Sequence, residues 1–177
     1  MNDHATAMLR THSGLAVLLF VLGLGVAQAL YSRAELPERV ASHFNAAGKP
    51  DDWTSRDGLV KFQCGVLLAM GALFGLSRRW MGMMPTPLVN LPNKEFWLAP
   101  ERRAQSLDLL ARWMHWIGAA TLAFLMLVFQ FTVQANLRNG SLNMPLFLTL
   151  TGFYLAGIIV ASVWIYRRFR IPMAERS

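Results

Sequence analysis

Residues 13–31 have the sequence SGLAVLLFVLGLGVAQALY and carry no charged side chain over 19 positions. As an α-helix this stretch is about 28 Å long, close to the thickness of the hydrocarbon core of a bilayer. Three further apolar segments of similar length lie at about 59–77, 113–134 and 144–166. The sequence therefore predicts an all-α integral membrane protein, a four-helix bundle that forms a single membrane domain over 1–177.

The composition supports this interpretation and excludes other classes of protein. The 177 residues are 54% apolar and only 15% charged, whereas a soluble domain has roughly 25% charged residues. Disordered chains combine low hydrophobicity with high charge, and disulfide-rich secreted modules need paired cysteines, but Cys64 is the single cysteine here. The net charge of +7 lies in short segments beside the apolar runs, so we expect the lipid bilayer, and no nucleic acid, as a partner.

The positions of lysine and arginine predict the orientation of the helices. Eleven of them fall in the N-terminal segment, the 78–112 loop and the C-terminal segment. The other six are five in the 32–58 and 135–143 loops and Lys61, in the first turn of the second apolar segment. The more basic side of a membrane protein faces the cytoplasm. We therefore expect both termini and the 78–112 loop to be cytoplasmic, and the other two loops to be extracytoplasmic.

The first apolar segment has an alternative interpretation. Arg10, the apolar run that follows it, and the small residues Ala27 and Ala29 resemble a secretory signal with an A-x-A cleavage site. Cleavage would leave three helices. The length of the run favours an uncleaved helix, in which Gly23, Gly25 and Ala27 form a small-residue face for helix packing.

The 32–58 loop contains a cluster of residues with ligand chemistry, His43, Asn45, Asp51 and Asp52, next to the aromatic Trp53. Imidazole and carboxylate groups suit a transition metal or a proton relay. Such spacing is also typical of a turn held together by hydrogen bonds, and so few ligands favour no metal and no cofactor. We expect these five residues to bind a ligand on the extracytoplasmic side.

The same loop has eight residue types in a fixed order, with Gly48 suited to the positive φ of a turn: Leu36, Pro37, His43, Phe44, Gly48, Pro50, Asp51 and Trp53. This order resembles the signature of the membrane family of domain of unknown function 1648, although the family more often has proline where this chain has Ala41. The same module opens the SdpI-type membrane proteins, which give immunity to a secreted peptide toxin and signal its presence. The resemblance implies a multi-pass protein of the bacterial inner membrane that senses the envelope, or protects against a membrane-active peptide, without catalysis.

Prolines keep the first half of the 78–112 loop non-helical, and Pro100 followed by Glu101 predicts the start of a helix. Apolar residues then recur at helical spacing, which predicts an amphipathic segment on the inner membrane face before the third span. A basic loop that only sets the topology is the alternative. Seven positions resemble a second recurrent segment of the same family: Asn90, Pro92, Asn93, Trp97, Pro100, Glu101 and Arg102. A cytoplasmic protein partner or a second copy of the chain is the expected contact of this loop.

Three polar side chains lie near the outer end of the third span. Gln130 and Gln134 are one helical turn apart, and Asn136 follows them, with Gln28 near the outer end of the first span. Polar groups in a bilayer are costly, so they indicate either hydrogen bonds between helices or a ligand pocket. The uncharged side chains favour hydrogen bonds, and we retain Gln130, Gln134 and Asn136 as candidate ligand-binding residues.

Catalysis is not expected, because the chain has no phosphate-binding, metalloprotease or serine-hydrolase motif. His12 and His115 near the cytoplasmic helix ends raise the hypothesis of a haem with two histidine ligands, which no attachment motif supports. Two alternatives to the sensor or immunity role stay open. One is a transporter component, for which an ionisable residue at the membrane midplane is expected, and the other is a membrane-embedded metal-dependent enzyme that uses His43 with Asp51 or Asp52.

Overall fold

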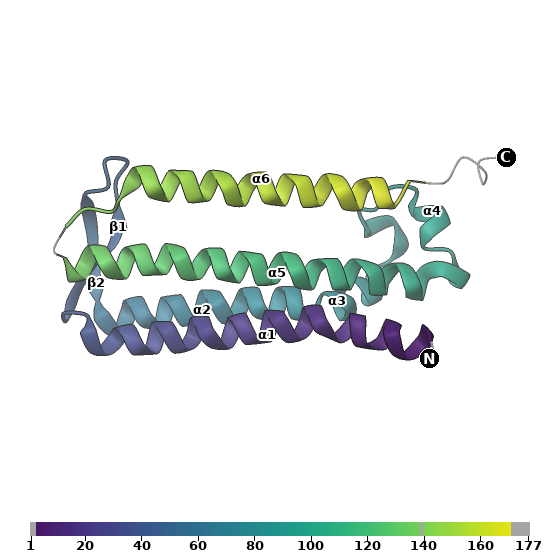
Figure 1. Ribbon diagram of the computed structural model, residues 1–177, viewed down its shortest axis with the longest axis horizontal. Coiled ribbons are helices and arrows are strands. Elements are labelled where there is room, and N and C mark those ends of the chain that lie inside the picture. Colours follow the sequence, from purple (N-terminus) through teal and green to yellow (C-terminus); the bar gives the residue numbers. More distant parts are fainter. Residues whose placement is uncertain (1–2, 139, 171–177) are drawn as a thin grey trace.

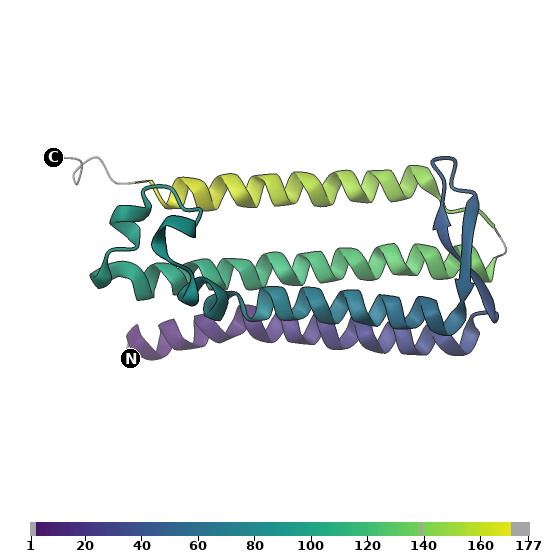
Figure 2. The same ribbon diagram turned by 180° about the vertical axis from the view of Figure 1, so that it is seen from behind.

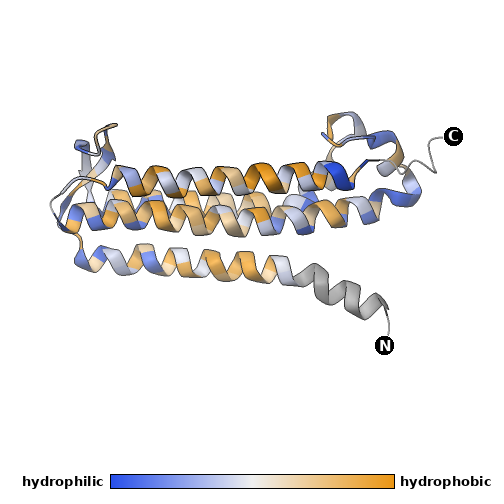
Figure 3. Ribbon diagram, turned by 45° about the horizontal axis from the view of Figure 1, so that its top comes forward, coloured by the Kyte–Doolittle hydropathy of each residue, from blue (hydrophilic) through white to orange (hydrophobic). Residues whose placement is uncertain are grey.

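Four long helices lie side by side along the molecule (Figure 1): α1 (Asp3–Glu35), α2 (Arg56–Gly75), α5 (Pro100–Leu137) and α6 (Met144–Arg168). The computed structural model describes residues 3–138 and 140–170, with side chains from residue 13 onward. Each helix includes a stretch long and apolar enough to cross a membrane, and apolar residues cover the middle of the bundle (Figure 3). The chain is a multi-pass membrane protein with the four spans that the sequence predicts.

The two ends of the bundle carry different structures. At one end, the hairpin end, β1 (Arg39–Phe44) pairs antiparallel with β2 (Pro50–Ser55). The other end, the cap end, carries α3 (Ser77–Met83), η1 (Thr86–Leu88) and α4 (Lys94–Trp97). Figure 2 shows that α1 begins and α6 ends on the side of the cap.

The hairpin differs from the prediction of an all-α fold. The prediction is correct for the four spans, but it does not include these two strands. Val40 is fully buried in a cluster with Leu59 of α2 and Val133 of α5, so β1 packs one face on the helices. The turn closes with a hydrogen bond from the Gly48 N–H to the Asn45 carbonyl, 2.8 Å, and Gly48 has the expected positive φ of 76°. The extended step that Pro50 imposes begins the second strand.

Helices α1, α2 and α5 form a closely packed unit. Its core contains Leu18, Leu67 and Leu122, whose side chains are fully buried. A Cβ atom added at Gly118 of α5 would overlap the side chains of Phe74 and Leu18. Glycine is therefore needed at this position, because only a hydrogen atom leaves room for α1 and α2 to approach α5 this closely.

The small-residue face predicted on α1 is wrong at two of its three positions. Gly25 is buried, and a Cβ atom added there would lie 3.1 Å from the side chains of Leu67 and Met126, whereas Gly23 and Ala27 are exposed. Residues two positions apart on a helix point in different directions, so the three residues do not share one face.

The fourth span, α6, lies beside α5 and away from α1 and α2 in both views (Figures 1 and 2). Ile165 is its single buried residue among those described. In the middle of the helix the ring of Tyr154 stacks on Phe124 with centroids 4.2 Å apart, and the Tyr154 hydroxyl lies 2.9 Å from that of Thr121. α6 thus touches the rest of the bundle mainly along one narrow strip and at its ends.

The amphipathic segment expected to lie on the membrane surface is instead the first part of α5, which runs unbroken from Pro100 to Leu137. Its apolar side, with Leu107 and Ala111, is buried within the protein. On its polar side Asp108 accepts a hydrogen bond from Arg78 of α3 at 2.6 Å. The helix therefore continues into the third span without a break, and the apolar side of its first part packs on the cap.

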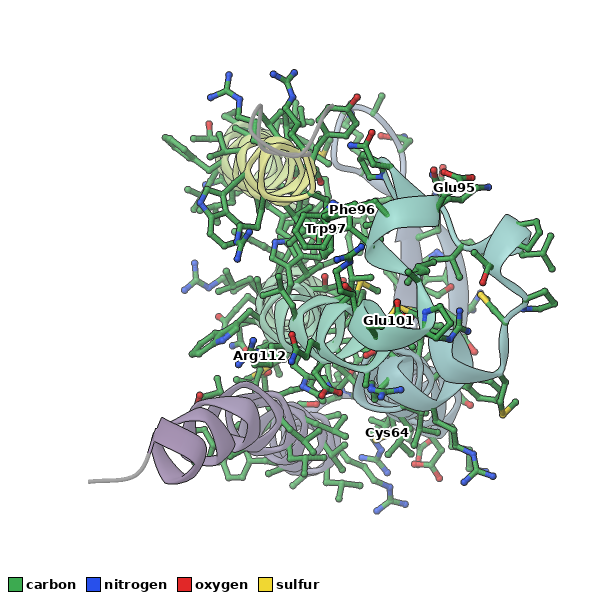
Figure 4. All side chains as sticks on the ribbon, turned by 90° about the vertical axis from the view of Figure 1, so that its right-hand side faces the viewer. Cys64, Glu95, Phe96, Trp97, Glu101 and Arg112 are labelled. Atoms are coloured by element: carbon green, nitrogen blue, oxygen red, sulfur yellow. The ribbon has the colours of Figure 1, made fainter. Side chains whose placement is uncertain are left out.

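The cap holds the last turn of α6. Phe169, 1% exposed, packs in a cluster with Val89, Leu91 and Leu107. The Phe169 carbonyl accepts a hydrogen bond from the indole of Trp97 at 2.7 Å and another from the amide of Asn93 at 3.0 Å. Figure 4 shows Phe96 and Trp97 between α4 and the end of α6. The cap therefore fixes α6 at this end of the bundle.

Candidate functional site

The hairpin is fixed to the helices through one buried side chain, Asn136 of α5. Its Oδ1 accepts a hydrogen bond from the Ala41 N–H at 2.6 Å, and its Nδ2 donates to the Ala41 carbonyl at 3.0 Å and to the Thr132 carbonyl at 2.9 Å. Arg56 adds a hydrogen bond to the Leu36 carbonyl at 3.1 Å. The Asn136 amide is thus occupied in positioning the hairpin, although the sequence made it a candidate ligand-binding residue.

Two of the candidate ligand-binding residues, Asn45 and Asp52, form hydrogen bonds with the backbone of the hairpin itself. The Asn45 carboxamide oxygen accepts hydrogen bonds from the N–H groups of Ala47 and Lys49, at 3.0 and 3.1 Å. Asp52 accepts one from the N–H of Trp53 at 2.8 Å. These bonds match the turn that was the alternative to a metal site, since short polar side chains often satisfy backbone groups of a turn.

His43 and Asp51 form an exposed pair across the hairpin. The Nδ1 atom of His43 lies 2.5 Å from a carboxylate oxygen of Asp51, and the two side chains are 68% and 42% exposed. The carboxylate orients the imidazole ring, and the other ring nitrogen has no hydrogen-bond partner within the described part of the chain. The pair can therefore offer one ring nitrogen to a molecule outside the protein.

A pocket lies between the hairpin and the start of α2, and we call it the hairpin pocket. Trp53 and Phe62 give it an aromatic side, 47% and 64% exposed, and the Arg39 guanidinium lies 5.6 Å from the centre of the Trp53 ring. The pocket is lined by Ser42, His43, Asp52, Trp53, Thr54, Gly58, Leu59 and Phe62. It combines hydrogen-bonding groups with apolar surface at the end of a membrane span.

The second pocket lies at the hairpin end between α5 and α6, and we call it the α5–α6 pocket. Gln130 and Gln134 both line it. Gln130 accepts a hydrogen bond from Gln28 of α1 at 2.6 Å, as the sequence predicts for a contact between helices. The Gln134 side chain has no such partner among the described residues. The pocket is lined by Leu127, Gln130, Phe131, Gln134, Ala135, Arg138, Ser141, Leu142, Asn143 and Leu146.

The structure divides the predicted ligand-binding residues into separate groups. His43, Asp52 and Trp53 meet at the hairpin pocket, with Asp51 beside His43. Gln130 and Gln134 face the α5–α6 pocket instead. The hairpin lies on the helix ends, so the two sets do not form one site.

The residues of the two loop segments that resemble the family mainly have structural roles. Leu36 is 2% exposed, Pro37, Phe44 and Pro50 line a small crevice against Asn136, and Gly48 accepts a hydrogen bond from the Leu142 N–H at 2.9 Å. In the cap, Pro100 and Glu101 begin α5. The Arg102 Nε donates to the Phe96 carbonyl at 3.0 Å, with the guanidinium 3.9 Å from the Phe96 ring centre. Asn90 and Pro92 lie in the chain between η1 and α4.

No group of three or more His, Cys, Asp or Glu residues that could hold a metal ion is found in the residues described. His115 is 6% exposed and neither ring nitrogen has a hydrogen-bond partner in the described chain. The side chain of His12, the other residue of the haem hypothesis, lies outside the described part of the structure.

Sequence reasoning missed two residues that line these pockets and one buried polar residue among the helices that support them. Phe62 lines the hairpin pocket and Arg138 lines the α5–α6 pocket. Gln63, 1% exposed, lies between α1, α2 and α5 with neither amide atom paired in the described residues. A signal existed for Arg138, because it follows Gln134 by four residues and so shares a face of the helix with it.

Comparison with known proteins identifies one region of the chain. Residues 18–62 match the family model described as domain of unknown function (DUF1648). Neither a curated protein nor a solved structure matches the chain. The match runs from Leu18 of α1 through the hairpin to Phe62 of α2 and does not reach the second segment, Asn90 to Arg102, whose resemblance stays a prediction. The match supports the family that the order of residues in the first loop predicts, domain of unknown function 1648.

Proposed function

We propose that this protein is a non-catalytic sensor or immunity protein of the bacterial inner membrane, similar in role to SdpI-type proteins, that binds a membrane-active peptide at the hairpin pocket. The observation that supports this proposal best is the pocket itself. It lies on a hairpin held by Asn136, and it places Trp53 and Phe62 beside polar groups at the end of the membrane spans.

The proposal includes an orientation. Because the 78–112 loop and both chain ends carry most of the lysine and arginine residues, the cap end faces the cytoplasm and the hairpin end faces outward. A peptide that arrives from outside then meets the hairpin first. The basic cap, with Arg79 and Arg112 among its exposed or half-buried cations, is the surface for a cytoplasmic partner or a second copy.

An amphipathic peptide suits the hairpin pocket for two reasons. The strand β2 has β1 as its single neighbour in the described sheet, so its other edge offers backbone groups to an added strand. In the pocket, Trp53 of β2 and Phe62 of α2 supply apolar surface while Asp52 and His43 supply polar groups. A peptide lying at the membrane interface presents both kinds of surface.

The two alternative functions have less support. A transporter component is expected to carry an ionisable residue at the midplane, and the middle of each described span has no Asp, Glu, Lys or Arg. A metal-dependent enzyme would have to rely on the pair of His43 and Asp51 with Asp52, and Asp52 is already bound to the Trp53 N–H.

The test is a deletion strain challenged with a panel of membrane-active peptides and with envelope stress. We expect the deletion to raise sensitivity to at least one peptide and the wild-type gene to restore resistance. Complementation with Trp53→Ala and with Phe62→Ala is expected to fail, because each removes an aromatic wall of the pocket. Complementation with His43→Ala and Asp51→Ala tests the polar side of the same site. Unchanged sensitivity of the deletion strain would contradict the proposal.

A matched control is Tyr31→Ala. Tyr31 is also a large exposed aromatic residue, 69% exposed, near the hairpin end of α1, but it does not line the hairpin pocket. The control should restore resistance fully. If Tyr31→Ala fails as Trp53→Ala does, the loss reflects general damage at the membrane surface and not the pocket.

A further inference from the structure

The face of α5 that borders α6 carries a stripe of hydrogen-bond donors. Gln130, Gln134 and Arg138 follow one another at intervals of four residues and all line the α5–α6 pocket. Four residues of helix correspond to about 6 Å along its axis. The three side chains therefore form a ladder that runs from the end of the helix toward the middle of the membrane.

These donors are available to an external molecule. The Arg138 side chain is exposed and makes no hydrogen bond or ion pair with any described residue. The Gln134 amide also has no hydrogen-bond partner among the described residues. The carboxamide oxygen of Gln130 accepts the hydrogen bond from Gln28, which leaves the Gln130 NH₂ group free to donate to another molecule. No Asp or Glu lines the pocket. The pocket thus offers donors and one positive charge with no carboxylate to neutralise them, which favours an acceptor-rich anion.

Apolar residues of the same two helices adjoin the polar ladder. Leu127 lines the pocket about one turn deeper than Gln130, and Phe131 and Leu146 line it beside the polar side chains. Farther toward the cap end a second apolar pocket lies between α5 and α6, lined by Trp113, Trp116, Ile117, Ala120, Phe153, Tyr154, Gly157, Ile158 and Ala161. The α5 residues of both pockets are spaced three or four positions apart, so they lie on one face of the helix.

We propose that the α5–α6 pocket is a binding site for one anionic phospholipid of the leaflet at the hairpin end. The order of chemistry along the α5–α6 contact matches the order of groups in such a lipid. Arg138 at the helix end faces the phosphate, Gln134 and Gln130 one and two turns deeper donate to the ester carbonyls, and the apolar surface of the two helices adjoins an acyl chain. This site is separate from the hairpin pocket and does not depend on the proposed immunity function.

A lipid fits the geometry of α6 as well. α6 is attached at its two ends, through Phe169 to the cap and through the Leu142 N–H to Gly48 of the hairpin. Between these attachments Tyr154 contacts Phe124 and Thr121 of α5, and one pocket between the two helices lies on each side of this contact along the helix. In a bilayer, lipid is the surrounding molecule that already carries an anion at one depth and hydrocarbon below it.

The test uses the full-length protein in detergent micelles, titrated with phosphatidylglycerol or with phosphatidylcholine and followed by native mass spectrometry. We expect tighter binding of phosphatidylglycerol than of phosphatidylcholine. Loss of a charge-assisted hydrogen bond in Arg138→Gln should weaken phosphatidylglycerol binding about tenfold, and Arg138→Lys should retain most of the binding. Gln134→Leu should weaken it about threefold, in line with one neutral hydrogen bond. A circular dichroism spectrum like that of wild type shows that each variant is folded.

The matched control is Lys61→Gln, which removes one positive charge from the hairpin end of α2, away from the pocket. It should leave the affinity for phosphatidylglycerol unchanged, and inorganic phosphate should not displace the lipid. The proposal is overturned if Arg138→Gln binds as the wild type does, or if Lys61→Gln weakens binding equally. Displacement by inorganic phosphate would also overturn it, since the site would then recognise a free anion.

Discussion

The unit of α1, α2 and α5 and the single helix α6 are both made of helices apolar enough to cross a membrane, yet they are held in place differently. In the unit, Leu18, Leu67 and Leu122 are fully buried and Gly118 brings the helices into close contact. In α6, no residue of the most apolar 18-residue window is buried. A Cβ atom added at Gly152 or Gly157 of α6 would meet no other atom within 4 Å.

This difference indicates a division of roles. The closely packed unit supports the hairpin through Asn136, so the hairpin pocket has a fixed base. The open side of α6 leaves room for the α5–α6 pocket. Hydrophobicity alone does not distinguish the two regions, because lipid is as apolar as a protein core, and close packing and polar contacts decide which helices associate.

The largest expected effect is at Gly118. Gly118→Ala should lower the free energy of unfolding by about 3 kcal/mol, since the added methyl group forces α1 and α2 away from α5. Gly152→Ala in α6 raises the helix propensity by the same amount, but its added methyl group meets no other atom within 4 Å, so this variant should not be destabilised. Thermal unfolding in detergent micelles compares the two. Equal stability of both variants would show that the unit is packed no more closely than α6.

The next effect is at the support of the hairpin. Asn136→Ala leaves the buried N–H and carbonyl of Ala41 without partners and should cost about 2 kcal/mol. Limited proteolysis should cut the hairpin faster in this variant than in wild type. Asn45→Ala is the comparison, because it loosens the turn and leaves the attachment to α5 intact. A hairpin equally resistant in Asn136→Ala and wild type would contradict the role given to this side chain.

A smaller effect is expected where α6 meets the cap. Trp97→Phe removes the hydrogen bond to the Phe169 carbonyl and should cost about 1.5 kcal/mol. Tyr154→Phe removes the hydroxyl contact with Thr121 in the middle of the helix and should cost only about 0.6 kcal/mol, typical of a hydrogen bond between membrane helices. Unfolding of both variants in micelles measures the difference. A greater loss in Tyr154→Phe would mean that α6 is held along its middle and not at its end.

The smallest expected effect is a gain in stability. Gln63→Leu replaces a buried amide, unpaired among the described residues, with an apolar side chain of similar size. The free energy of unfolding should rise by about 1 kcal/mol, because the cost of the buried polar group is removed. Thermal unfolding detects this shift. A loss of stability would show that the Gln63 amide has a partner in the membrane-embedded protein.

Sequence reasoning predicts the spans well because each is a long run without charge, and the same runs appear as helices. It also predicts the positive φ of Gly48, since only glycine adopts such a conformation at low cost. The hairpin is harder to predict. Strand β2, with the sequence PDDWTS, has no alternation of apolar and polar residues, and its partner β1 is fixed by Asn136, 95 residues further along the chain.

The candidate sites were predicted only in part, for a related reason. His43 and Asp51 meet because the strands pair, and their spacing in the sequence fits a turn equally well. The separation of Gln130 and Gln134 from the hairpin residues depends on where α6 lies, and its uniformly apolar sequence does not predict which helix it contacts. The sequence predicts a membrane-surface position for the amphipathic start of α5, because the cap that covers it consists of short elements between prolines, which are hard to recognise from the sequence.

The orientation of the bundle is the claim on which the proposed function depends most directly. It is tested by cysteine labelling in intact cells, in a Cys64→Ser background with one new cysteine, Ala46→Cys at the exposed hairpin tip or Glu95→Cys in the exposed part of the cap. A membrane-impermeant maleimide is predicted to label the Ala46→Cys protein in intact cells and the Glu95→Cys protein only after lysis. The reverse pattern would place the hairpin pocket in the cytoplasm and contradict the account.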